Sequence, residues 1–167
     1  ASHAGVSKLT VYSHFTDKQT LFGSAVMATC QNQLPELMFE LPAGVPIDQV
    51  LLNIARNFHA LISSDESVKL SRLIMALGSQ DPGFGQYFYE AGPKLILAEM
   101  EALLRNAAER GLLAIGSPLR AAEHFFCLLK GAPDYRLLLG CAPPLVGAEA
   151  EAHVREVVEL FVRAYAP

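Results

Sequence analysis

Residues 1–22 carry the pattern that most constrains what this chain can fold into. Gly5 separates two short helical patterns and suits a turn that needs a positive φ, which glycine adopts without a steric penalty. Ser7 is a typical N-cap residue, and the short helix that it begins carries Val11 and Phe15 on one side. Two short helices joined by a glycine turn, with a polar second helix, are typical of a helix-turn-helix whose second helix enters the major groove of DNA.

A further helix start follows within the same stretch. Thr16, with Gln19 three residues later, forms a capping-box pattern that predicts the start of a longer helix. The prolines and glycine of residues 35–46 interrupt that helix and indicate a connector. The sequence therefore predicts two parts, a helix-turn-helix part over residues 1–34 and a second part, the body, over residues 35–167.

The front is the only part of the chain that is not acidic. The whole chain carries a net charge of −4, which by itself does not indicate a nucleic-acid-binding protein. Residues 1–34 hold Lys8 and Lys18 against Asp17, a net charge of +1, so the remainder carries −5. This distribution suits a protein that contacts DNA at one end.

Helical spacing runs through the body. Its apolar residues recur three and four residues apart, and no segment alternates with period two for long enough to predict a strand. Gly92-Pro93 is expected to interrupt one helix, and Gly131 with Pro133 to divide another, because proline clashes with the preceding helical turn. With 51% hydrophobic residues, the chain can bury a sizeable core. We predict an all-α fold, with helices over about 47–62, 64–77, 82–110, 118–130 and 148–165 and a short apolar segment over 135–139. Ser63, with Glu66 three residues later, forms a capping-box pattern at the start of the second of these helices.

Several function classes lack their sequence signals. The chain shows no P-loop, no GxSxG motif and no zinc-ligand cluster, and Gly83-Phe84-Gly85 lacks the third glycine of a dinucleotide fingerprint. No two of its histidines stand at metal-ligand spacing, and no apolar run is long enough to span a membrane. Cys30, Cys127 and Cys141 form no CxxC motif and fit free, buried thiols in a reducing cytoplasm. We therefore expect no enzyme, cofactor, metal or membrane span, and a cytoplasmic location.

The residue types of the front stretch are more specific than their spacing. They closely resemble the signature of the tetracycline-repressor (TetR) family at Ala4-Gly5-Val6-Ser7-Lys8, Thr10-Val11-Tyr12-Ser13-His14-Phe15, Lys18 and Leu21-Phe22. In that family a first helix and most of a second precede this point, so we expect the sequence to lack the first part of the DNA-binding domain. An ordinary helical hairpin with a chance glycine is the alternative interpretation.

The resemblance places five residues on the DNA-facing side. Lys8, at the start of the short helix, can reach a phosphate or a guanine edge. Thr10 and Tyr12 carry hydroxyls suited to phosphate oxygens, and His14 can do either. Lys18 lies in the first turn of the next helix, where free N–H groups already favour a phosphate. We predict that these residues contact double-stranded operator DNA; a solvated helix face is the alternative.

The body resembles one branch of the same family. Residues 89–93, 108–111 and 118–125 are similar to the C-terminal domain of AefR-like regulators. This resemblance implies that residues 35–167 are a C-terminal ligand-binding and dimerisation domain, with a homodimer formed through the last two long helices and a cavity for a small-molecule effector. The dimer interface is expected at Phe125, Leu129, Val154, Val158, Phe161 and Tyr165. Aromatic and soft side chains with a few polar points are typical of ligand sites, so the effector is expected to contact Phe58, His59, Met75, Tyr87, Phe88 and Phe126, with plain core packing as the alternative for each.

Two functions remain open on the sequence alone. The first is an all-α, two-domain, homodimeric TetR-like transcription regulator that acts as a ligand-responsive repressor. The second is a helical protein-interaction or small-molecule-binding module that does not bind DNA. The front motif favours the first, and DNA binding by the protein with its upstream residues restored would discriminate between them.

Overall fold

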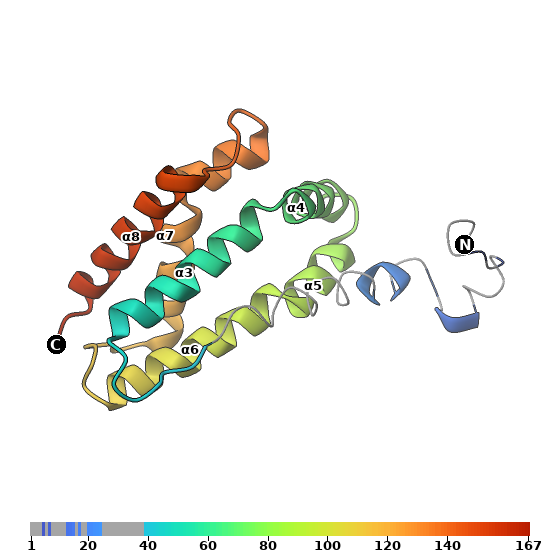
Figure 1. The fold of residues 1–167 in the computed structure, drawn as a ribbon. Coiled ribbons are helices and arrows are strands. Elements are labelled where there is room, and N and C mark those ends of the chain that lie inside the picture. The colour runs from blue at the N-terminus through green and yellow to red at the C-terminus, as the bar shows by residue number, and fades with distance from the viewer. Residues whose placement is uncertain (1–4, 6, 8–12, 16, 18–19, 25–38) are drawn as a thin grey trace.

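The computed structural model describes residues 5, 7, 13–15, 17, 20–24 and 39–167. Residues 39–167 form six α-helices, and no strand occurs among the described residues, which confirms the predicted all-α fold. The helices are α3 (Ile47–Ser63), α4 (Asp65–Gly78), α5 (Pro82–Ala91), α6 (Pro93–Glu109), α7 (Pro118–Leu139) and α8 (Gly147–Ala164) (Figure 1).

Short sequence signals set several helix starts. The Ser64 side chain accepts a backbone N–H at the start of α4, so the cap is Ser64 and not the predicted Ser63. At α5, Asp81 caps the helix and Pro82 takes the first helical position, where a missing N–H leaves no bond unmade. Gly92 then separates α5 from α6, as its sequence position predicts.

The predicted division of α7 is present as a bend. Gly131 adopts a non-helical conformation, with φ 49° and ψ −156°, two residues before Pro133. Because Pro133 has no N–H, the Leu129 carbonyl four residues earlier lacks its helical donor. The Nε2–H of His153 donates to that carbonyl at 2.8 Å. The bend in α7 is therefore held by a side chain of α8.

Four helices enclose the hydrophobic core. α6 packs against α7, and α3 packs against both α7 and α8 (Figure 1). Phe125 of α7 and Phe161 of α8 are fully buried and pack edge to face, with ring centroids 5.1 Å apart. Burying one side chain of this size contributes about 1.5–3 kcal/mol to folding. The core therefore fixes α8 against α7 and α3 within one protomer.

An arginine of α4 caps the end of α7. Arg72 donates from Nη2 to the Leu137 carbonyl at 2.7 Å and from Nε to the Leu138 carbonyl at 2.9 Å. These carbonyls lie in the last turn of α7, which ends at Gly140 in the left-handed region with φ 76°. The contact joins α4 to the bent half of α7.

Candidate functional site

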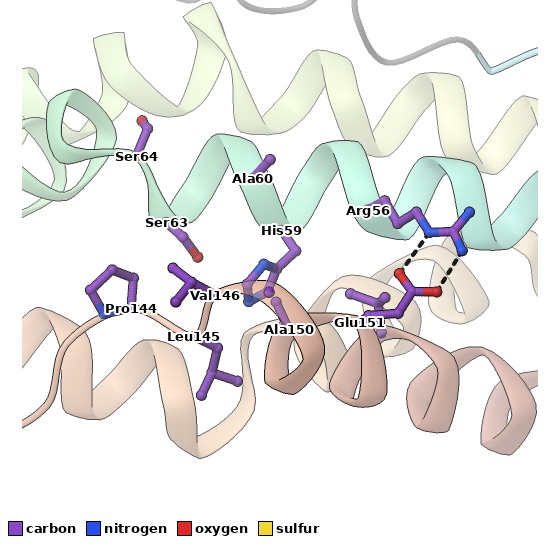
Figure 2. Close-up of a pocket in the computed structure, with 12 residues that line it drawn as sticks. Arg56, His59, Ala60, Ser63, Ser64, Pro144, Leu145, Val146, Ala150 and Glu151 are labelled. Carbon is purple, nitrogen blue, oxygen red and sulfur yellow. Dashed lines mark hydrogen bonds and ion pairs between the residues drawn. The ribbon is translucent and has the colours of Figure 1, made fainter.

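An open pocket lies between the C-terminal half of α3 and the start of α8 (Figure 2). Its volume is about 390 Å³, which is within the range of small-molecule sites. The walls come from α3, the α3–α4 junction, the α7–α8 connection and the first turns of α8. The lining residues are Arg56, His59, Ala60, Ser63, Ser64, Pro144, Leu145, Val146, Gly147, Ala150, Glu151 and Val154.

A bidentate ion pair forms one edge of the pocket. Arg56 donates from Nε and Nη2 to the two carboxylate oxygens of Glu151, at 2.9 and 2.5 Å (Figure 2). Arg155 lies one turn further along α8, with its Nε 2.5 Å from the same carboxylate. The hydrogen bond from Arg56, together with the charge of Arg155, lowers the pKa of Glu151 to about 2. The carboxylate is therefore ionised at neutral pH, and Arg56 already has its partner.

His59 is the buried polar residue of the pocket, and its side chain lies near two other titratable groups, His153 and Asp134. Burial lowers the pKa of His59, and the neighbouring His153 lowers it further, against the opposing effect of Asp134. The two imidazole centroids are 5.8 Å apart. Burial raises the pKa of Asp134, against the charges of Lys130 and His59. His59 is therefore neutral at physiological pH and has one donor and one acceptor nitrogen.

We expect the free energy of unfolding to fall as pH is lowered from about 7.5 to about 5.5. The folded-state pKa of His59 lies below its ordinary value of 6.5, so the unfolded chain takes up this proton first and stability declines below that pH. Asp134, whose pKa is raised, acts in the opposite direction. His59→Phe should lose less stability over this range than the parent chain, as measured by urea unfolding at both pH values. Equal losses in the two proteins would contradict this assignment.

The residues predicted to contact an effector do not form one site. Only His59 lines the pocket described above. Phe58 and Phe126 are buried, with ring centroids 4.4 Å apart and tilted by 44°, so they belong to the core, which is the alternative given for them above. The remaining three lie on α4 and α5, are exposed or half-buried, and do not line this pocket: Met75, Tyr87 and Phe88.

The residues predicted at the dimer interface do not present an exposed surface. Tyr165 is half-buried, and its hydroxyl lies 2.8 Å from Nδ1 of His124. The other five are buried within one protomer, and their exposed fractions do not exceed 4%. The apolar stripe of α8 thus faces the core of its own protomer, and the predicted dimer contacts stay a prediction. The five buried residues are Phe125, Leu129, Val154, Val158 and Phe161.

One of the five predicted DNA-contacting residues lies within the described part of the chain. Lys8, Thr10, Tyr12 and Lys18 lie outside the described residues. His14, the fifth, is exposed and lies in a short helical turn. The predicted DNA contacts therefore stay a prediction.

The start of the next helix is visible in part. Thr16 and Gln19, the predicted capping box, lie outside the described residues. Within them, the Asp17 carboxylate accepts the Thr20 N–H at 2.7 Å, which is the hydrogen bond of an N-cap. Gly5 has φ 64°, as expected for the glycine turn.

Residues 1–34, called the front segment below, contact the body through α5 at two described residues, Phe22 and Gly23. Phe22 packs edge to face against Phe84, with ring centroids 5.0 Å apart. One residue later, a Cβ atom added to Gly23 would lie 3.1 Å from Cδ1 of Tyr87, so glycine allows the backbone to approach that ring closely. Phe22 and Gly23 are thus packed directly on α5 (Figure 1).

Other candidate sites receive little support. Within the described part of the chain, no group of three or more His, Cys, Asp or Glu side chains could hold a metal ion. The described helices include none that is long and apolar enough to cross a membrane. Cys127 and Cys141 are free thiols and exposed, so the expectation that they are buried was wrong, and Cys30 lies outside the described residues.

Comparison with known families and structures points in one direction. Residues 49–167 match the family described as "AefR-like transcriptional repressor, C-terminal domain". Comparison with curated proteins gave no match.

Solved structures of similar fold come from the same kind of regulator. A transcriptional regulator from Mesorhizobium loti MAFF303099, assigned to the TetR family, is 34% identical, with a TM-score of 0.86 over 99% of this chain and 83% of that chain. The flavonoid-responsive regulator FrrA is 28% identical, with a TM-score of 0.85 over 100% of this chain and 84% of that chain. A TetR family regulator from Pseudomonas syringae pv. tomato DC3000 is 24% identical, with a TM-score of 0.78 over 100% of this chain and 84% of that chain.

Proposed function

Because this chain belongs to the TetR family of transcription regulators and is not an enzyme, we propose that it binds operator DNA as a homodimer and that a small-molecule effector weakens this binding. The observation that carries the proposal is the contact of the front segment with α5, at Phe22–Phe84 and Gly23–Tyr87. A displacement of α5 must move the front segment with it. We consider two arrangements of the body that differ in the position of α5. An effector that binds one of them more tightly changes the free energy of DNA binding by up to the difference between its binding free energies for the two.

The direction of regulation and the class of effector come from the relatives. The matched family is described as containing repressors, so we propose that DNA-bound protein blocks transcription and that the effector relieves the block. FrrA is a flavonoid-responsive regulator, so we propose aromatic polyphenols as the first effectors to test. The effector acts on the body, because the front segment is the part that faces DNA.

The direct test is a map of the DNA bound by the natural protein that contains this sequence. Recovered sites should contain two half-sites about one helical turn apart, since two helix-turn-helix heads related by two-fold symmetry contact successive major grooves. Fluorescence anisotropy with one such site then measures affinity with and without effector. Absence of any sequence-specific binding would favour the alternative, a helical module without DNA binding.

Lys18→Ala in the natural protein should weaken binding to all DNA sequences alike. The proposed role of Lys18 is to neutralise one phosphate, so its loss should reduce the slope of log affinity against log salt concentration by about one unit. Tyr12→Phe should weaken binding without changing that slope, because the tyrosine hydroxyl carries no charge. Anisotropy titrations at several salt concentrations measure both effects. An unchanged slope in the lysine variant would remove Lys18 from the phosphate contacts.

A further inference from the structure

The N-terminus of α8 opens into the α3–α8 pocket without a side-chain cap. Val146 occupies the N-cap position, with φ −136° and ψ 160°, and it cannot accept a hydrogen bond from the first turn. Among the described residues, no side chain accepts from the first-turn N–H groups of this eighteen-residue helix. Val146 and Gly147 both line the pocket. The free N–H groups of α8 are therefore beside the cavity, where an acceptor atom of a ligand could take them.

His59 supplies a second polar point from the opposite wall. It is only 8% exposed and makes no hydrogen bond to any described residue. Its imidazole reaches from α3 toward Val146 and Ala150 (Figure 2). Among the described residues, every side-chain nitrogen that is fully sealed from solvent has a hydrogen-bond partner. Because the ring nitrogens of His59 have no such partner, they are not fully sealed, and the pocket gives access to them. A buried imidazole without a partner costs stability unless a ligand or water completes its hydrogen bonds.

We propose that this pocket binds the effector through an aromatic hydroxyl group, which hydrogen-bonds His59 and the open N-terminus of α8. The inference rests on the proposed ligand-responsive function and names the site and the chemical group that it recognises. A hydroxyl oxygen accepts from the first-turn N–H groups, and its proton is donated to the imidazole. The apolar ring system lies against Pro144, Leu145 and Val154.

The charges around the pocket favour a neutral hydroxyl over a carboxylate. Arg56 is already paired with Glu151, so it does not supply an unpaired positive charge. Glu149 lies in the first turn of α8 and repels an anion at that helix end. His59 is neutral at physiological pH, because burial lowers its pKa. A group that both donates and accepts one hydrogen bond matches this environment.

The position of the pocket also connects it to the front segment. Ser64, which lines the pocket, is the N-cap of α4. α4 packs against α5, and α5 carries the contact with Phe22. A ligand that changes the spacing of α3 and α8 at this junction therefore acts on the elements that hold the front segment.

The test measures binding of 7-hydroxyflavone and of flavone, which differ only in the hydroxyl group, by calorimetry. The parent chain should bind flavone about tenfold more weakly, the effect of one hydrogen bond left unmade. His59→Phe keeps a ring of similar size and should lower the affinity for 7-hydroxyflavone about tenfold. Val146→Asp should raise Tm by capping α8 and at the same time lower this affinity, because the new carboxylate occupies the N–H groups. Leu95→Ala, at an exposed position on α6 away from the pocket, should bind like the parent chain.

Three results would overturn the inference. The first is equal affinity of the parent chain for both flavones, and the second is no binding of either flavone. The third is an unchanged affinity for 7-hydroxyflavone in His59→Phe or Val146→Asp, whichever of these variants folds. Val146→Asp alone decides the matter if His59→Phe does not fold, because Val146 is 68% exposed and its replacement leaves the core intact. Anisotropy with operator DNA separates this inference from the proposed function. If the protein binds operator DNA but neither pocket variant changes the affinity for 7-hydroxyflavone, only the proposed pocket is refuted. If the flavone affinities change as expected but the protein does not bind DNA, only the proposed regulatory function is refuted.

Discussion

Truncation of Phe161 to alanine should lower the free energy of unfolding by about 3–5 kcal/mol, which is the usual cost of removing a buried phenylalanine and leaving a cavity. Phe161 is 1% exposed, and its ring packs on Phe125 at 5.1 Å and on Tyr165 at 4.7 Å between centroids. The neighbouring rings cannot collapse into the space, because Phe125 is itself fully buried and the Tyr165 hydroxyl is held at Nδ1 of His124. Urea unfolding followed by circular dichroism measures the loss.

Leu95→Ala is the matched control for this prediction. Leu95 also lies on a long helix, α6, but it is 45% exposed, so its truncation should cost about 1 kcal/mol or less. A loss in Phe161→Ala as small as in the control would mean that Phe161 is not part of a packed core. The same burial predicts that aspartate at Val158 and Phe161 unfolds the protomer, so that double change cannot test dimerisation.

The helices of the body could be predicted because their signals are local. Asp81-Pro82, Gly92-Pro93 and the bend at Gly131 act within a turn of the residues concerned, and each is where the sequence places it. The position of one cap differs by a single residue, because Ser63 and Ser64 are equally good cap residues and only tertiary packing selects between them.

The candidate pocket could not be predicted in the same way. Arg56 and Glu151 are 95 residues apart in the chain, and the open start of α8 matters only because His59 lies opposite. The signal that could have been used is Val146, a poor N-cap residue directly before a strongly amphipathic helix. Periodicity likewise identified the apolar side of α8 correctly, but it does not distinguish a side buried in its own protomer from one buried in a dimer.

Exposed leucines on α7 and α8 provide a different surface for the proposed dimer. Leu128 and Leu160 are 36% and 46% exposed. Leu128 follows His124 by one turn of α7, and Leu160 follows His153 by two turns of α8. Both histidines make hydrogen bonds between α7 and α8, so the two leucines lie on the flanks along which these helices meet. In a two-fold symmetric dimer, α7 and α8 of one protomer pack against α7 and α8 of its partner, and this packing buries both leucines against their copies.

Leu128→Glu combined with Leu160→Glu should therefore raise the dimer dissociation constant about 1,000-fold. Burial of the exposed part of each leucine contributes about 0.5–1.5 kcal/mol, two leucines of each protomer lose this contribution, and four like charges meet across the axis. Sedimentation velocity measures the dissociation. Tm of the monomer should change little, because both side chains are already exposed in one protomer. Leu95→Glu, which adds the same charge on α6, should leave the dimer intact. If the double variant stays dimeric with undiminished affinity, the two-fold axis does not lie on α7 and α8, and the predicted spacing of half-sites on DNA loses its structural basis.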